Sequence, residues 1–228
     1  MSNHHNGWMA LSSEEARVLA SLIEKEATVA DSYPLTLNAL RLACNQSTNR
    51  HPVVAYEDRI VEAALMALKS IGLVRFVHPS HGGRTIRYRH IAGERWHLEP
   101  AELAVLAVLT LRGPQTAGEL RARTERLLGP EDHTVEEILD SLAARSPEPF
   151  AVHLERRPGE RDARWAHLLT GAVDDVEPAP AAGRPADTSA AATPPPPPWA
   201  ADLADEVESL RRRLDRLETL FGVDPELP

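Results

Sequence analysis

Three arginines lie close together where the sequence alternates like a β-strand. Arg84, Arg87 and Arg89 are separated by uncharged residues, and Arg75 and His78 belong to the neighbouring predicted strand. Because alternate residues of a strand share a face, Arg87 and Arg89 are expected to point to the same side. Guanidinium groups bind phosphate oxygens, so such a face is suited to lie along a nucleic-acid backbone. The alternative is a hairpin face that is basic and only solvated.

A second polar group lies between residues 45 and 52. Its members carry side-chain amides, hydroxyls or a guanidinium, namely Asn45, Gln46, Ser47, Thr48, Asn49 and Arg50. Such groups can bond phosphates or base edges, and Arg50 could hold a phosphate with two hydrogen bonds. They can equally bond the backbone of an irregular loop, and we favour this structural role for the amides. A continuous positive surface from the hairpin to Arg41 and Arg50 would favour DNA.

The motifs of common enzyme classes are absent from the sequence. It has no P-loop, dinucleotide fingerprint, metalloprotease motif or nucleophile elbow. His78 and His81 flank a predicted turn, but no cysteine or carboxylate completes a zinc site. The single cysteine, Cys44, lies beside Leu40 and Ala43 on an apolar helix face and is expected to be buried. We therefore predict a protein that is not an enzyme and needs no metal or cofactor.

Charge is distributed unevenly along the 228 residues. The formal net charge is −9 for the whole chain, but it is +2 over residues 11–90, −4 over 91–170 and −7 over 171–228. A net negative charge argues against nonspecific binding of nucleic acid by the whole surface. A DNA contact would therefore have to be a local patch within residues 11–90.

Nothing in the sequence predicts export or a membrane span. The first ten residues lack the pattern of a signal peptide, and the longest apolar stretch, 103–111, is far shorter than the ~20 residues that a spanning helix needs. A lone cysteine fits a reducing compartment. We expect a cytoplasmic protein with no membrane contact.

The C-terminal part of the chain predicts a linker and a helix. Residues 171–200 are rich in Pro and Ala and are expected to form a disordered acidic linker, and residues 1–10 a disordered tail. Residues 201–222 carry a heptad seam formed by Leu203, Val207, Leu210, Leu214, Leu217 and Phe221. The seam predicts a coiled-coil helix that joins two copies into a homodimer. The alternative is a helix that folds back on its own chain.

The rest of the chain follows one plan twice. In the first copy, helices are expected from Ser12, where Glu15 completes a capping box, from near Leu35, and from about Glu57 to Gly72, followed by strands at 73–77 and 85–89. In the second copy, helices are expected at 101–111, 116–128 and 134–144, where Thr134 and Glu137 form a capping box, followed by strands at 150–154 and 163–167. Three helices and a two-stranded wing are the winged helix-turn-helix plan.

The predicted fold class is therefore mainly α with small β wings (α+β). It consists of two tandem winged helix-turn-helix domains, at residues 11–91 and 97–170. We expect the two small domains to pack against each other.

Several short motifs carry a family resemblance over roughly residues 10–170. They are YPLTLNAL at 33–40, ACNQ at 43–46, NR at 49–50 and YRH at 88–90, with Thr48 and His51 as departures from the usual charge pattern. With these motifs the chain resembles the YceH-like family of bacterial proteins. The resemblance implies two winged helices in tandem, often with a coiled-coil tail, and it implies no established activity.

The third helix of each copy has charges that do not suit a helix reading bases in the major groove. Both helices begin with acidic residues, namely Glu57, Asp58 and Glu62 in the first and Glu136, Glu137 and Asp140 in the second. These charges suit a helix start but repel phosphate. We therefore predict a DNA-binding protein, as in a transcriptional regulator, that touches the phosphate backbone through its first wing. The alternative is a protein-protein interaction scaffold, similar in plan to the kleisin-binding subunits of bacterial condensin.

Overall fold

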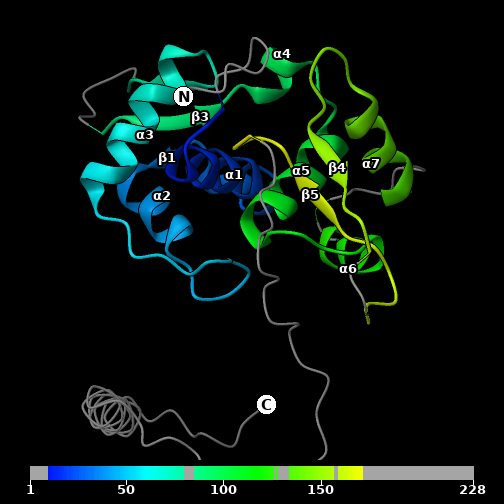
Figure 1. The fold of residues 1–228 in the computed structure, drawn as a ribbon. Helices are drawn as coiled ribbons and strands as arrows, with labels where there is room; N and C mark the ends of the chain where they lie inside the picture. The colour runs from blue at the N-terminus through cyan, green and yellow to red at the C-terminus, as the bar shows by residue number, and fades with distance from the viewer. Residues whose placement is uncertain (1–9, 80–84, 126, 128–133, 157–158, 172–228) are drawn as a thin grey trace, which may run out of the picture. The chain divides into compact units, whose positions relative to one another are not determined.

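The computed structural model describes residues 10–79, 85–125, 127, 134–156 and 159–171 of the chain. It is a mixed α+β structure with helices and small antiparallel sheets (Figure 1). The helices are α1 (Ser13–Thr28), α2 (Leu37–Cys44), α3 (Asp58–Ser70), α4 (Ala92–Trp96), α5 (Pro100–Arg112), α6 (Ala117–Thr124) and α7 (Val135–Ala144), with a 3-10 turn, η1, at Ala30–Ser32. The strands are β1 (Leu35–Thr36), β2 (Val74–Val77), β3 (Arg87–His90), β4 (Ala151–His153) and β5 (Trp165–His167). The coiled-coil helix predicted at 201–222 and its six seam residues lie outside the described residues.

Side-chain caps fix where the helices begin. The Ser12 hydroxyl accepts a hydrogen bond from the Glu15 backbone N–H (3.2 Å), and the Glu15 carboxylate accepts one from the Ser12 N–H (3.1 Å). Thr134 and Glu137 form the same reciprocal pair at the start of α7. Both predicted capping boxes are confirmed. Each satisfies backbone N–H donors that have no partner within the helix at its first turn.

Two central helices organise the core. α1 and α5 pack side by side, and each is buried over consecutive residues rather than along one stripe (Figure 1). For α5 the sequence explains this burial, since an almost wholly apolar helix must be covered on all sides. A single cluster of buried side chains runs from α1 through α3 to α5 and α7. The first and second halves of the described chain therefore share one core.

The sheets differ in detail from the sequence prediction. The first has the order β1-β3-β2, with Leu35 opposite Tyr88 on one side of β3 and Phe76 opposite Tyr88 on the other. The two-residue strand β1 was not expected, because it is too short to show a period. The second sheet is the hairpin of β4 and β5, and a bridge joins Gln115 to Trp165 at its edge.

The short helix α4, which the sequence did not predict, connects the two halves. Gly93 within it has a close neighbour on each side: a Cβ there would lie 3.1 Å from the Leu98 carbonyl oxygen and 3.2 Å from Leu103 Cδ1. A larger residue would have to displace the start of α5, so glycine permits this close packing.

Candidate nucleic-acid interface

The hairpin of β2 and β3, the first hairpin, has one core face and one outer face. Pairing places Arg75 opposite Arg89 and Val77 opposite Arg87, so all three arginines belong to the outer face. The inner face carries Val74, Phe76, Tyr88 and His90, which are buried or half-buried. We call Arg75, Arg87 and Arg89 the basic face. The sequence prediction that Arg87 and Arg89 share a face is confirmed, and the register adds Arg75 to that face.

The buried side of β3 is held by polar contacts. The His90 backbone N–H donates to the Tyr33 hydroxyl (2.8 Å), and the His90 Nδ1 accepts from the Ala92 N–H (3.3 Å). The other ring nitrogen, Nε2, lies 2.6 Å from Glu26 Oε2, and this contact lowers the pKa of Glu26. Burial raises the pKa of Tyr33, so its hydroxyl stays protonated at neutral pH. These contacts fix β3, and with it the orientation of the basic face.

Electrostatically, the basic face has an excess of positive charge. Arg75 and Arg89 both approach Glu94, at 3.4 and 3.2 Å, and Arg87 donates to the Pro34 carbonyl oxygen at 2.8 Å. The side chains of Arg75 and Glu94 are both 58% exposed, so this pairing is weak and leaves the guanidinium free to exchange partners. Three arginines therefore meet Glu94 on an accessible surface, and Glu26 lies within electrostatic reach of Arg89.

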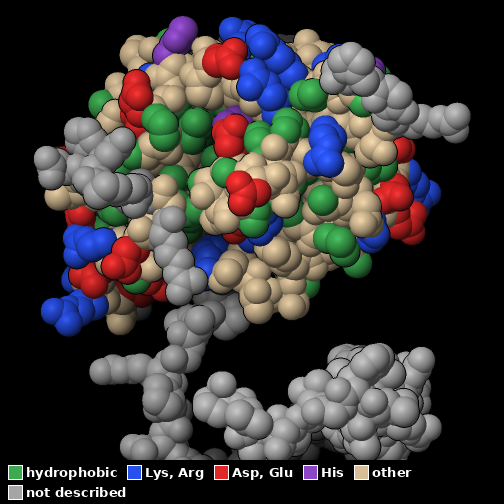
Figure 2. Space-filling view, turned by 180° about the vertical axis from the view of Figure 1, so that it is seen from behind, with side chains coloured by type: hydrophobic (Ala, Val, Ile, Leu, Met, Phe, Trp, Pro, Cys, Tyr) green, Lys and Arg blue, Asp and Glu red, His purple; other side chains and the backbone are tan. Residues whose placement is uncertain are grey.

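Elsewhere the charges are mixed. On the side seen in Figure 2, most groups of basic side chains lie beside acidic ones. On α3, Arg59 pairs with Glu57 at 2.8 Å, and Met66 is 60% exposed. The exposed side of α3 therefore has no concentrated positive charge, as its acidic start predicted.

The structure corrects the expectation for Arg50. Its side chain has no exposed area, and the guanidinium holds Glu24 with two hydrogen bonds (3.1 and 2.6 Å). Arg50 also donates to the backbone oxygens of Ala43 (3.1 Å) and Asn49 (2.9 Å). Burial tends to raise the pKa of Glu24, but the hydrogen bonds and charge of Arg50 outweigh it and the pKa is lowered. Arg50 is a structural residue, because its side chain is inaccessible to phosphate and four of its five N–H donors are used within the protein.

The three side-chain amides of the predicted loop also bond within the protein. Asn45 clamps the backbone of Tyr56 through both ends of its amide (2.9 and 2.8 Å), as expected for a structural role. The Gln46 amide oxygen accepts from Lys25 at 3.5 Å, and Asn49 accepts from Arg112.

Arg41 and Arg84 are the other two arginines of the predicted DNA contact. Arg41 is partly exposed and pairs with Asp58 at 2.8 Å, so its charge is already compensated. Arg84 lies outside the described residues. A continuous positive surface from the hairpin to Arg41 and Arg50, the feature that would favour DNA, is therefore not present among the described residues.

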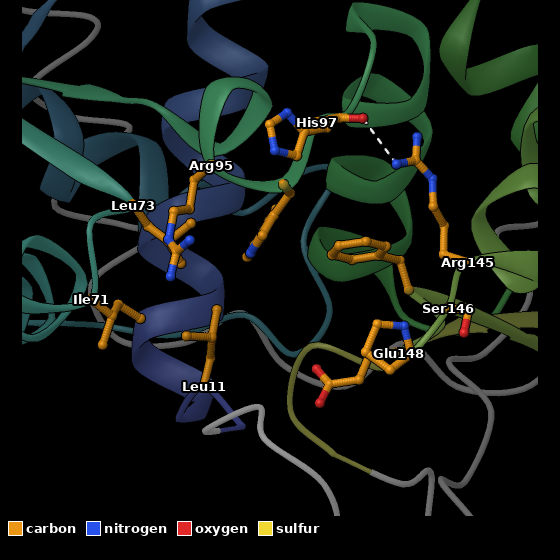
Figure 3. Close-up of a pocket in the computed structure, with 11 residues that line it drawn as sticks. Leu11, Ile71, Leu73, Arg95, His97, Arg145, Ser146 and Glu148 are labelled. Atoms are coloured by element: carbon orange, nitrogen blue, oxygen red, sulfur yellow. Dashed lines mark hydrogen bonds between the residues drawn. The ribbon is translucent and has the colours of Figure 1, made fainter.

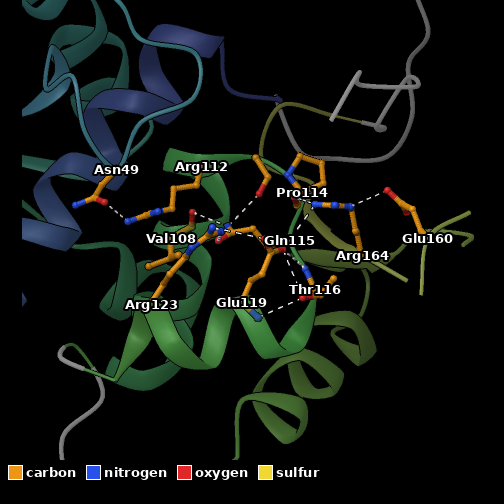
Figure 4. A network of polar contacts seen from close by, with 11 residues as sticks. Asn49, Val108, Arg112, Pro114, Gln115, Thr116, Glu119, Arg123, Glu160 and Arg164 are labelled. Atoms are coloured by element: carbon orange, nitrogen blue, oxygen red, sulfur yellow. Dashed lines mark hydrogen bonds and ion pairs between the residues drawn. The ribbon is translucent and has the colours of Figure 1, made fainter. Parts of the chain in front are cut away.

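A polar network that the sequence did not reveal joins the two halves (Figure 4). Gln115 is 2% exposed, and its amide donates to the backbone oxygens of Val108 (3.2 Å) and Gly113 (3.1 Å) while it accepts from Arg123. Arg112 reaches Asn49 across the boundary between the halves. Arg112 and Asn49 are 63 positions apart, so no local sequence pattern marks their contact.

Cys44 is fully buried on α2, as predicted, and burial raises the pKa of its thiol to about 11. At pH 8 the thiolate fraction is then on the order of a thousandth. We expect a thiol reagent such as Ellman's reagent to react at least ~100-fold more slowly with the native protein than in urea. Equal rates in the two states would contradict the burial. Because burial raises the pKa of the thiol in the folded state, the contribution of the thiol to stability is full below its unfolded pKa. This contribution is lost as the pH rises above that value toward 11.

No group of three or more His, Cys, Asp or Glu side chains is arranged to hold a metal ion within the described part of the chain. In the same part, no helix is long and apolar enough to cross a membrane.

Fold and hairpin thus define an α+β protein with a basic, exposed two-stranded face. Residues 11–160 match the family model described as "Protein of unknown function, DUF480", and the chain belongs to this family. A UPF0502 protein of Geobacter sulfurreducens is 50% identical over 165 residues, covering 72% of this chain and 74% of the relative. One of Burkholderia multivorans is 43% identical over 216 residues, covering 94% and 90%. The family is consistent with the YceH-like resemblance, and these names state no activity.

Proposed function

We propose that the protein binds DNA and acts as a transcriptional regulator without enzymatic activity. In this proposal, residues 11–91 and 97–170 are two winged helix-turn-helix units, and the first hairpin is the wing that lies along the phosphate backbone. The single observation that carries the proposal is the cross-strand register that gathers Arg75, Arg87 and Arg89 on one accessible face, where Glu94 is the acid that pairs with two of them. Arginine forks on such a face match phosphate oxygens in spacing and charge.

Backbone contact is favoured over base reading because of the charge on α3. Glu57, its N-cap, and Asp58 pair with Arg59 and Arg41, so no net positive charge is left at the place where a recognition helix would enter the major groove. Phosphate contacts position a protein on DNA without reading its sequence. Sequence preference would then come from DNA shape or from the other parts of the chain.

Self-association through the predicted coiled-coil helix at 201–222 completes the proposal. Two copies would place two basic faces on one duplex and roughly double the number of phosphate contacts. We place this homodimer in the cytoplasm, where bacterial DNA is accessible.

Removal of the basic face tests where DNA binds. In fluorescence anisotropy with a random-sequence duplex at about 50 mM salt, we expect the variant Arg75→Ala/Arg87→Ala/Arg89→Ala to bind at least ~10-fold more weakly than the wild type. The matched control is Arg121→Ala on α6, whose side chain is 65% exposed and pairs with Glu136, and it should bind like the wild type. Circular dichroism is the check that both variants are folded. An equal loss in both variants would place the contact elsewhere.

A protein-binding scaffold is the second candidate. Leu42 on α2, Val53 before α3 and Met66 on α3 expose 55%, 59% and 60% of their surface, and exposed apolar side chains can serve as contacts for a protein partner. If the wild type binds no DNA at about 50 mM salt, this function takes precedence. Met66→Glu should then abolish partner binding while Arg75→Ala leaves it unchanged.

A further inference from the structure

A pocket of about 460 Å³ lies where the two halves meet, beside α4. Leu11, Ile71 and Leu73 of the first half form one part of its wall. Trp96 of α4 and Phe150 from the second half form an aromatic part, with ring centroids 5.2 Å apart and planes tilted by 57°. The volume is in the range of small-molecule sites, which are mostly apolar with a few polar groups that orient the ligand.

One of those polar groups is an uncommitted cation. Arg95 lines the pocket, is exposed, and has no acidic partner within the described ranges. Arg145, which also lines the pocket, is different: it holds Glu102 at 2.8 Å and the His97 carbonyl oxygen at 2.9 Å. Arg95 is therefore the guanidinium that a ligand anion would meet.

The second polar group is a carboxylate oxygen without a donor. Glu148 lines the pocket, and its Oε2 is shielded from solvent with no hydrogen-bond partner among the described residues. A buried acceptor left unpaired costs free energy, so such an atom calls for a ligand or water that donates to it. A ligand ammonium would supply both a donor and the opposite charge.

We propose that this pocket binds a small zwitterion of dipeptide size, with its carboxylate on Arg95 and its ammonium on Glu148. Arg95 and Glu148 come from different sides of the pocket in Figure 3, so a ligand that meets both must carry its two charges at different ends, as a dipeptide does. Apolar ligand side chains would pack against the aromatic pair and against Leu11 and Ile71. Such a ligand would bridge the two halves, and its binding does not depend on the function proposed above.

Isothermal titration calorimetry of the full-length protein tests the site with three probes. They are leucyl-phenylalanine, its N-acetyl form, which lacks the ammonium, and its C-terminal amide, which lacks the carboxylate. We expect leucyl-phenylalanine to bind with a Kd below about 1 mM, and each blocked form to bind at least ~10-fold more weakly, a difference of about 1.4 kcal/mol. Equal affinity for the three probes, or no heat with any of them at about 5 mM, would overturn the proposal.

Two variants assign the charges independently of any effect on stability. Glu148→Gln should remove the preference over the N-acetyl form but keep the preference over the amide. Arg95→Gln should do the reverse. Arg59→Gln, a change at an 80% exposed arginine of α3, is the matched control and should keep both preferences. If either pocket variant keeps both preferences, the assignment is wrong.

Discussion

Replacing Arg50 with methionine is expected to lower the free energy of unfolding by about 3 kcal/mol. The substitution keeps most of the apolar stem but removes four hydrogen bonds, two of them to Glu24 and one each to the backbone of Ala43 and Asn49. The Glu24 side chain is only 15% exposed and would keep Lys25, at 3.1 Å, as its remaining cation. Breaking a buried ion pair from one side is costly because the other charge stays buried. Urea unfolding followed by circular dichroism measures the change.

Arg41→Met is the matched control for this prediction. Arg41 lies on α2 and pairs with Asp58, but these side chains are 32% and 61% exposed, so the loss should stay below about 1 kcal/mol. A loss of the same size in both variants would mean that Arg50 is not a buried partner.

The loss of stability in Arg50→Met should depend on pH, because Arg50 pairs with the ionised form of Glu24. Because the pKa of Glu24 is lowered in the native state, its paired form stabilises the protein fully above its unfolded pKa of about 4.3. This stabilisation is lost as the pH falls through the lowered native pKa. The difference between the wild type and Arg50→Met should therefore be constant from about pH 5 to 8 and should shrink below about pH 4.

Leu109→Ala is expected to cost about 3 kcal/mol. Leu109 has no exposed surface and lies on α5, the helix that packs along α1 in the shared core. Truncation removes apolar contacts and leaves a cavity that the close-packed neighbours fill only in part. Leu42→Ala, at a 55% exposed position, is the control and should change stability by less than about 0.5 kcal/mol.

The shared core gives this prediction a second readout. Since one buried cluster includes side chains of α3 in the first half and α7 in the second, Leu109→Ala should speed hydrogen exchange in both helices by a similar factor. Faster exchange confined to the second half would show that the halves unfold separately.

Local signals explain what could be predicted from the sequence. The capping boxes at Ser12 and Thr134 involve residues three positions apart, and the starts of α1 and α7 were placed correctly from them. The alternation around Arg87 and Arg89 likewise predicted the outer face of β3. In these cases the residues that define the feature lie within one short element.

Long-range contacts explain what could not be predicted. Arg50 has the same local surroundings as an exposed loop arginine, and only the approach of Glu24, 26 positions earlier, makes it a buried residue. Strand β1 exists because β3 passes beside Leu35 and Thr36, and α4 is a five-residue helix without a period of its own. Residues of this kind are fixed by tertiary structure and carry no local signature.

The salt dependence of DNA binding tests the central claim most directly. Anisotropy of the wild type with a random-sequence duplex, from about 50 to 300 mM salt, should give a log–log slope of about −3 if one basic face binds and about −5 if a dimer uses two. The variant without Arg75, Arg87 and Arg89 should lose most of that slope, because each lost phosphate contact reduces it by about 1. No binding at the lowest salt, or an unchanged slope in the variant, would contradict the assignment of the first hairpin as a phosphate contact.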